Sequence, residues 1–394
     1  MLHDRLWCAA CGGDLADFLD LGSSPLADSF PQDAAAKERW YPLVAAVCMK
    51  CQLAQLRAVV PDEELYGDDY GFRTGSSPAA VRYFASLAGE LLGEHGREAR
   101  KLTAEIACND GTLLGNFARA GCPVLGIEPV KGAAFTAADK NGAEVITQPF
   151  SLALGQELRG RAGLVLAFNV AAHVADPVDF LKGARELLAK DGVAVIEFQD
   201  LDALIAGCQF DHVYHEHRFY YSLGSFGRLA VKCGLDITDW KRTPAQGGSL
   251  RVTLRRREGD RVTHWPPGLA EDMTQFEGMQ ARADYAKRRL RILVQAELNE
   301  GRVIAGWGAS AKSATLLGYC RLGPRQVAWV EDVTPGKIGR FTPGTHIPVR
   351  APGKKPDTYL LTSWNYAGSM LRAEREFLDG GGRVIVPGAV PVIL

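Results

Sequence analysis

The segment EIACNDGTLL (105–114) is the pattern on which the fold prediction rests. The residues AEIA (104–107) are typical of a buried strand, and LLGNFARA (113–120), after the turn, is typical of a helix. A second strand, VLGIE (124–128), follows directly. A strand, a glycine turn, a helix and another strand in this order predict a unit with parallel strands.

The same alternation continues along the chain. Further strands are expected at 143–148, 164–169 and 193–198, and helices at 78–95 and 177–192. This pattern predicts a parallel sheet with helices on both faces. The Pro-Pro-Gly at 266–268 ends it; a long helix is then expected at 269–301, and a second strand, glycine turn and helix at 303–318. We therefore predict an α/β protein divided into 1–75, 76–265 and 266–394.

Bulk composition limits the function classes. A chain of 394 residues is too long for one ordinary core, and 47% hydrophobic with 23% charged residues is typical of a soluble globular protein. A net charge of −1 implies no general attraction to nucleic acid or to an anionic membrane. The longest apolar run, 163–174, is too short to cross a bilayer, and the first residues lack the apolar stretch of a signal peptide. A cytoplasmic location is expected.

Two cysteine pairs predict a metal site. Cys8, Cys11, Cys48 and Cys51 form two C-x2-C motifs, and each motif can present two thiolates from one tight turn. Four thiolates complete a tetrahedral zinc site and leave no position open, so the zinc would be structural. The alternatives are unrelated pairs or a redox dithiol. A nucleic-acid-binding ribbon is disfavoured because the segment between the pairs is acidic.

The first glycine turn indicates the cofactor. It lacks G-x-G-x-x-G, with Ala107 at the first glycine position, and it carries Glu105, Asn109 and Asp110 beside Cys108. Carboxylates repel a pyrophosphate but attract the sulfonium of S-adenosylmethionine, by roughly 4 kcal/mol at ~4 Å and an effective dielectric near 20. The turn thus favours S-adenosylmethionine over NAD. The alternative is a turn with solvated acids.

Two residues at later strand ends complete the predicted cofactor site. Glu128 ends the second strand, where an acid can bind the ribose diol, and Asn169 ends the fourth strand at the same edge.

The chain resembles the sugar-nucleotide C-methyltransferases, in particular the C-3 methyltransferases of dTDP-4-keto-deoxysugars, over nearly its whole length. The resemblance implies a small zinc-binding domain (1–75), a class I (Rossmann-like) S-adenosylmethionine-dependent methyltransferase domain (76–265), and a linker helix with a Rossmann-like substrate-binding domain (266–394). Ala107 and Phe72 depart from the family pattern. The landmarks are the cysteine pairs, YGFRTGSS (70–77), CNDGTLL (108–114), GIEP (126–129), HV (173–174), FDHVYHEH (210–217), GGSLRV (247–252), GASAKSATLL (308–317) and TPGTHIPV (342–349).

The resemblance also implies roles in the segment DHVYHEHRFYY (211–221). His217 would remove the proton beside the ketone, since imidazole titrates near neutral pH. Tyr214 would stabilise the oxyanion, and Glu216 would orient or bind the substrate. His215 is an alternative base or a substrate contact, because it shares a face with His217 if the segment is extended.

Three further residues, one at the end of this segment and two outside it, complete the implied substrate site. They are His173, Tyr70 in an aromatic loop, and Tyr221. There are two alternatives for the histidines. They could form a metal site with an acid, or they could have no catalytic role and lie at the surface or in the core.

The second glycine turn, GWGASAK (306–312), predicts a diphosphate contact through backbone amides and Lys312, with Arg251 as a weaker substrate candidate. The alternative is a turn that has no binding function and an exposed lysine. The overall prediction is an S-adenosylmethionine-dependent C-methyltransferase acting on a nucleotide-linked keto-deoxysugar, without nucleic-acid or membrane partners, and compatible with a monomer. The alternatives are a nicotinamide-dependent sugar-nucleotide oxidoreductase and a non-catalytic zinc-ribbon interaction protein.

Overall fold

The computed structural model describes residues 3–66, 73–259 and 268–394. The N-terminal part contains β1 (His3–Asp4), β2 (Leu15–Ser24), β3 (Tyr41–Cys48), β4 (Ala54–Leu56), β5 (Ala58–Val59), α1 (Asp62–Leu65) and the short 3-10 helix η1 (Thr74–Ser76). Strands β2, β3 and β4 pair antiparallel, and the fourth strand of their sheet, β11 (Phe219–Tyr220), comes from much later in the chain. The histidine segment is thereby attached to the N-terminal sheet.

The central part is built around a seven-stranded sheet in the order β12-β13-β10-β9-β6-β7-β8. Its elements are α2 (Pro78–Ala99), β6 (Thr103–Ile106), α3 (Leu114–Arg119), β7 (Val124–Ile127), α4 (Lys131–Asn141), β8 (Glu144–Ile146), α5 (Leu152–Glu157), β9 (Ala162–Phe168), α6 (Pro177–Leu187), β10 (Leu188–Gln199), α7 (Leu201–Gly207), η2 (Phe210–His212), α8 (Leu223–Lys232), β12 (Leu235–Thr243), η3 (Ala245–Gly247) and β13 (Ser249–Arg256).

The parallel sheet predicted from the sequence is confirmed for five of these strands. Strands β8, β7, β6, β9 and β10 run parallel, so their carboxyl ends share one edge. The antiparallel strands β13 and β12 at the other side were not predicted. The helix expected at 177–192 ends at Leu187, because β10 begins directly at Leu188, which pairs with Ala162 of β9.

The C-terminal part forms a six-stranded sheet in the order β16-β15-β14-β17-β18-β19. The single helix expected at 269–301 is divided, and α10 begins after Gly278, a residue that disfavours helix interiors. The elements are η4 (Leu269–Glu271), α9 (Thr274–Glu277), α10 (Met279–Asn299), β14 (Ile304–Trp307), α11 (Ala311–Cys320), β15 (Trp329–Glu331), β16 (Val349–Arg350), β17 (Thr358–Leu360), η5 (Trp364–Tyr366), α12 (Ala367–Ala373), α13 (Arg375–Asp379), β18 (Arg383–Val386) and β19 (Val392–Ile393).

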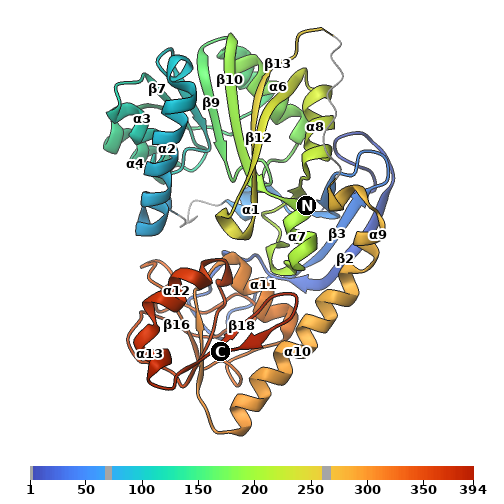
Figure 1. The fold of residues 1–394 in the computed structure, drawn as a ribbon, viewed down its shortest axis with the longest axis vertical. Coiled ribbons are helices and arrows are strands. Elements are labelled where there is room, and N and C mark those ends of the chain that lie inside the picture. Colours follow the sequence, from blue (N-terminus) through green and yellow to red (C-terminus); the bar gives the residue numbers. More distant parts are fainter. Residues whose placement is uncertain (1–2, 67–72, 260–267) are drawn as a thin grey trace.

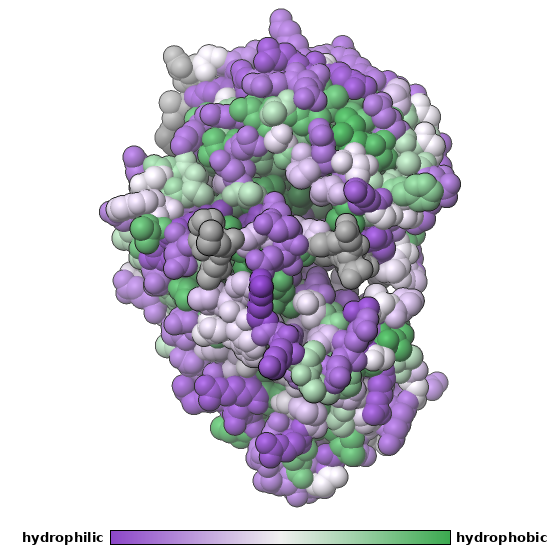
Figure 2. Space-filling view, turned by 180° about the vertical axis from the view of Figure 1, so that it is seen from behind, coloured by the Kyte–Doolittle hydropathy of each residue, from purple (hydrophilic) through white to green (hydrophobic). Residues whose placement is uncertain are grey.

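The arrangement brings all three parts together around the histidine segment. Figure 1 shows the seven-stranded sheet above and the six-stranded sheet below, with β2 and β3 at one side between them and α10 running down beside the lower sheet. One apolar core joins residues of β2 and β3 to α7, α10 and α11. Seen from behind, a band of hydrophobic residues crosses the upper half beneath a hydrophilic top edge, and the lower half is mixed (Figure 2). Within the described ranges, no helix has the length and apolarity to span a bilayer.

Candidate active site

The turn after β6 has an unusual backbone. Ala107, Asn109 and Gly111 have φ angles of +55°, +50° and +72°. Left-handed backbone costs roughly 1–2 kcal/mol for a residue with a side chain. This explains why a glycine suits the position of Ala107, although the chain keeps the turn without it.

A second segment holds this turn in place. The Thr74 N–H donates to Oδ1 of Asn109, and the Gly75 N–H donates to Oδ2 of Asp110, both at 2.9 Å. A Cβ atom on Gly75 would lie only 2.5 Å from that Asp110 oxygen, so glycine is needed for the approach. The end of the YGFRTGSS landmark therefore supports the cofactor turn. This pairing was missed from the sequence, because nothing local indicates it.

Glu128 lies at the end of β7 with a fixed carboxylate. Its Oε2 accepts the Asn109 N–H and its Oε1 accepts the Val130 N–H, each at 2.9 Å. Burial raises its pKa, but the two backbone bonds favour the ionised form. An oriented carboxylate at this edge of the sheet suits hydroxyl recognition.

The other two acids carry less effective charge than the sequence suggested. Lys140 lies 3.3 Å from the buried Asp110 and offsets its charge. Burial, together with Asp110 and Glu128, holds the pKa of Glu105 well above its usual range, and Oε2 of Glu105 has no hydrogen-bond partner among the described residues. The attraction between these acids and a sulfonium is therefore weaker than the sequence suggested.

The remaining two predicted cofactor residues differ in exposure. Asn169 follows β9 in the left-handed region, and its N–H donates to the Glu197 carbonyl at 2.8 Å. Asn169 is exposed at the sheet edge. The Cys108 side chain is 3% exposed and packs in an apolar cluster with Leu114 and Ala137. The thiol therefore belongs to the core, and a cofactor contact stays a prediction for the backbone of this residue.

The histidine segment is a turn rather than an extended strand. After η2, the His217 N–H donates to the Tyr214 carbonyl at 2.9 Å. An extended segment would place His215 and His217 on one face; the turn separates them.

The hydrogen bonds of His217 fix its tautomer. Nδ1 lies 3.0 Å from the His212 carbonyl oxygen, which can only accept, so Nδ1 carries the proton. Nε2 is then an acceptor, and the Tyr214 hydroxyl donates to it at 2.6 Å. Burial, His173 and Lys312 hold the pKa of His217 well below its usual range. The residue as a whole is partly exposed. The result is a neutral imidazole whose basic nitrogen is occupied by the Tyr214 hydroxyl.

His173 lies against His217, with ring centroids 4.9 Å apart. Its Nδ1 is 2.9 Å from the hydroxyl of Tyr66, at the end of α1. Burial and then Arg218 lower the pKa of His173 to about 4. Tyr66 was missed from the sequence, because it lies 107 positions from its partner and belongs to no motif.

His215 faces the N-terminal sheet instead. It is 1% exposed, its Nε2 lies 3.2 Å from the Pro42 carbonyl oxygen, and its ring packs edge-on against Tyr41 at 5.6 Å. Burial lowers its pKa to about 4. This enclosure makes His215 the poorer candidate for the base.

Lys312 is buried rather than exposed, with 7% of its surface accessible. It lies in the first turn of α11, and its Nζ donates to Oε1 of Gln246 at 2.8 Å. Burial lowers the pKa of Lys312 to about 8, although the nearby Asp211 opposes this. His212 is fully buried in the same region, beside Trp364. The burial of Lys312 contradicts the alternative of a non-binding turn with an exposed lysine. The diphosphate contact stays a prediction.

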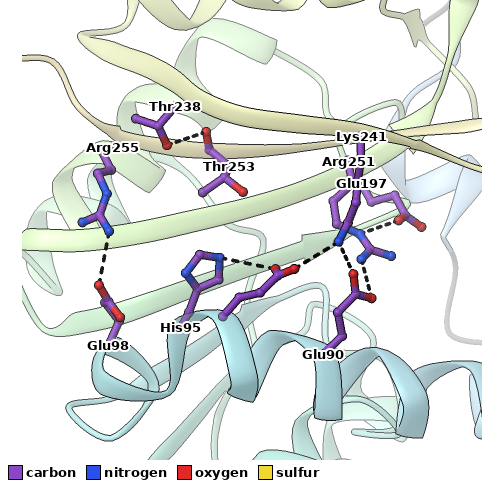
Figure 3. A network of polar contacts seen from close by, with 10 residues as sticks. Glu90, His95, Glu98, Glu197, Thr238, Lys241, Arg251, Thr253 and Arg255 are labelled. Carbon is purple, nitrogen blue, oxygen red and sulfur yellow. Dashed lines mark hydrogen bonds and ion pairs between the residues drawn. The ribbon is translucent and has the colours of Figure 1, made fainter.

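Arg251 is engaged in a structural network (Figure 3). Its Nε lies 2.8 Å from Glu197 and its Nη1 lies 3.1 Å from Glu90, which joins β13 and β10 to α2. Lys241 also pairs with Glu90. The charge of Arg251 is thus used to hold α2 on the sheet, and a substrate contact stays a prediction.

Tyr221 is likewise surrounded by protein. It is 1% exposed, its hydroxyl donates to the Ala171 carbonyl at 2.8 Å, and its ring packs against Phe198 and Phe226. A structural role fits these contacts better than substrate binding. Tyr70 lies outside the described residues.

The comparisons with known proteins cover nearly the whole chain. Three family models match: a zinc binding domain over residues 8–66, a methyltransferase domain over 82–239, and a C-methyltransferase C-terminal domain over 244–391. The C-methyltransferase NovU of Streptomyces niveus is 33% identical across 98% of this chain and 96% of its own length. The chain belongs to the C-methyltransferase family.

More distant relatives match only part of this C-methyltransferase. The ubiquinone biosynthesis O-methyltransferase of Azorhizobium caulinodans is 29% identical over 30% of this chain and 50% of its own length. The 1,6-didemethyltoxoflavin-N1-methyltransferase of Burkholderia thailandensis, solved with S-adenosylhomocysteine, is 17% identical with a TM-score of 0.40, and covers 53% of this chain and 98% of its own.

S-adenosylmethionine is the methyl donor of this C-methyltransferase, as the sequence predicted. The residues at the edge of the sheet fit it: an oriented Glu128 carboxylate, a buried Glu105 oxygen without a partner, and a turn fixed by η1. NAD, the alternative raised by the sequence, is not favoured.

The four cysteines of this C-methyltransferase fit a structural zinc ion. Their Sγ atoms all lie within 4.8 Å of one another, and the pairs Cys8–Cys51 and Cys11–Cys48 are 3.5 and 3.4 Å apart. Sulfurs at 2.3 Å from a tetrahedral zinc are separated by about 3.8 Å. A Cβ on Gly13 would lie 3.1 Å from Sγ of Cys48, a tight contact that the glycine avoids. The zinc prediction is confirmed at the level of ligand set and domain.

Proposed function

We propose that this C-methyltransferase acts on a nucleotide-linked 4-keto-deoxysugar, of which a dTDP sugar is the expected form, and methylates the carbon beside the ketone (C-3). The observation that carries the proposal is the state of His217, a neutral imidazole whose Nε2 is the acceptor. Carbon bears no lone pair, so methylation needs a proton to be removed first. A ketone makes that possible by acidifying the adjacent hydrogen.

His217 is the proposed base. Its Nε2 takes the proton beside the ketone, and the electron pair of the C–H bond moves into the enolate. The imidazolium that forms keeps its Nδ1–H bond to the His212 carbonyl, which favours the charged form. Bound S-adenosylmethionine supplies the electrophilic methyl group.

Tyr214 is the proposed oxyanion donor. In the resting protein its hydroxyl donates to Nε2 of His217. Nε2 has a single lone pair, so the Tyr214 O–H must leave it before Nε2 can take the proton. The ketone oxygen of the bound substrate is the alternative acceptor, and the same O–H then stabilises the enolate oxygen. Removing one such donor typically costs about a hundredfold in rate.

His173 and Lys312 are proposed to contact the substrate from either side of this pair. His173 touches the His217 ring, and α11, which carries Lys312, packs against the histidine segment through the Thr315 hydroxyl and the Val213 carbonyl at 3.2 Å. The family membership does not favour the oxidoreductase or the non-catalytic zinc protein considered from the sequence.

The test incubates the zinc-loaded protein and S-adenosylmethionine with a panel of 4-keto-deoxysugar nucleotides and detects methyl gain by mass spectrometry. In deuterated water without S-adenosylmethionine, the hydrogen beside the ketone should exchange, and His217→Asn should abolish that exchange. Methyl transfer to oxygen or nitrogen acceptors alone would refute the proposal. Exchange retained in His217→Asn but lost in His215→Asn would move the base to His215.

A further inference from the structure

Glu216 stands between the two histidines and is buried, with 3% of its surface exposed. Its Oε2 makes no hydrogen bond within the part of the chain that the structure describes. The backbone N–H groups of Glu216 and Asp28 approach the carboxyl group, but an ionised oxygen that is buried without a partner of its own is costly. Such a group either meets a ligand or holds a proton.

The charges around Glu216 are already balanced without it. Its charged neighbours are Arg218 and Asp28. Arg218 pairs with Asp62, and Asp28 lies 3.5 Å from Lys337. The cations Arg218 and Lys337 thus already have acidic partners, so an ionised Glu216 would add an uncompensated negative charge beside Asp28.

The remaining titratable groups that face Glu216 are the hydroxyls of Tyr66 and Tyr220. Burial and the neighbouring Glu216 raise the pKa of both, so each is neutral. Neither supplies a cation. The backbone N–H groups of Glu216 and Asp28, and then Arg218, favour the ionised form of Glu216. Asp62 offsets the attraction of Arg218.

Asp28 comes from the zinc-bearing part of the chain, in the segment after β2. Its neighbour Ala27 packs with Tyr214 and with Ala314 of α11. Asp28 itself pairs with Lys337 of the C-terminal part. Three parts of the chain therefore meet beside the carboxyl group of Glu216.

We propose that Asp28 holds Glu216 in its protonated form, and that the carboxyl O–H of Glu216 donates a hydrogen bond to the ketone oxygen of the substrate. Glu216 is then a catalytic residue that keeps its proton throughout, and Asp28 is a positioning residue. The inference deepens the proposed function and rests on it.

The titration of Glu216 agrees with this arrangement. Burial, followed by Asp28, raises the pKa of Glu216 to about 8. The carboxyl group is therefore mostly protonated at neutral pH, and a carboxylic acid kept neutral by its site is an effective oxyanion donor. With Tyr214, it would give the developing enolate oxygen two donors.

The pH profile of turnover tests both residues. The native enzyme should lose turnover above a pH of about 8, as Glu216 ionises. Glu216→Gln keeps an N–H donor and cannot ionise, so this decline should disappear. Glu216→Ala should lose about a hundredfold in turnover at neutral pH.

Asp28→Asn should move the alkaline decline to lower pH by about one unit, because Lys337 is then free to attract ionised Glu216. Asp33→Asn, which neutralises an exposed acid of the same segment, is the matched control and should leave the profile in place. An unshifted decline in Asp28→Asn would refute the role of Asp28. A decline that persists in Glu216→Gln would refute the role of Glu216.

A substrate-free measurement separates this inference from the proposed function. The infrared difference spectrum between the native protein and Glu216→Gln should contain a protonated-carboxyl C=O band at pH 7, lost as the pH rises through about 8. Absence of that band overturns the proposal. A band that titrates as expected, in a protein that methylates no keto-sugar nucleotide, would instead overturn the proposed function and the donor role while the protonated state stands.

Discussion

His217 and His215 lie two residues apart on one turn, and their side chains face different parts of the molecule. Each has a tyrosine neighbour: the Tyr214 ring lies 4.0 Å from that of His217, and the Tyr41 ring lies 5.6 Å from that of His215. The first pair is joined by a hydrogen bond and reaches the surface in part; the second is enclosed by the N-terminal sheet. Residue type alone thus does not distinguish a base from a packing histidine; hydrogen-bond partners and access do.

Loss of the zinc site should have the largest effect. It should destabilise the N-terminal sheet, which encloses His215. Strand β3 carries Tyr41 and Pro42 at one end and the ligand Cys48 at the other. Cys8→Ser should abolish zinc binding and lower the free energy of unfolding by roughly 5 kcal/mol or more. Elemental analysis and thermal unfolding measure this. Cys122→Ser, which alters a buried thiol outside the site, should retain zinc.

Replacement of His217 should give the next largest effect. His217→Asn removes the basic nitrogen and should lower turnover by about a thousandfold, the middle of the range for general bases. S-adenosylmethionine binding, followed by calorimetry, should be retained. The matched variant His215→Asn should keep methyl transfer; the reverse pattern would exchange the roles of the two histidines.

The two tyrosines give a smaller and equally matched comparison. Tyr214→Phe should lower turnover by about a hundredfold, because the hydroxyl is the proposed oxyanion donor. Tyr41→Phe removes a hydroxyl that bonds to Glu64 and should cost about 1 kcal/mol of stability with little change in turnover. Steady-state kinetics and denaturant unfolding of both variants measure the contrast. Equal losses of turnover would contradict it.

The smallest effect concerns acid stability. The pKa of His215 is about 4 in the folded protein and near 6.5 when unfolded, so unfolding takes up a proton between these values. The contribution of His215 is complete above pH 6.5 and is lost as the pH falls towards 4. It should amount to about 2 kcal/mol between pH 7 and pH 5. His215→Asn should reduce this loss in denaturant unfolding, and an unchanged pH dependence would contradict it.

The sequence was most informative where structure is local. The strand, turn and helix at 104–120 were predicted because hydrophobic periodicity and one glycine determine them, and the four cysteines because their spacing is that of a zinc site. The residue roles suggested by the family resemblance stay predictions, as do the domain boundaries at 75 and 265.

What the sequence did not reveal depends on distant contacts. Tyr66 reaches His173, Gly75 reaches Asp110, and Arg251 is neutralised by Glu197 and Glu90. Each needs the tertiary fold to bring the partners together. The conformation of 214–217 likewise depends on packing between three parts of the chain, since the residues themselves would allow an extended strand.

The pairing of β11 with β4 has a consequence for biosynthesis. The sheet that carries the cysteine turns is completed only by Phe219 and Tyr220. During synthesis, the edge of β4 that pairs with β11 therefore stays unpaired until more than half of the protein has left the ribosome. The first 66 residues are in this sense not an autonomous folding unit, and exchanging that region between relatives would have to bring along its closing strand.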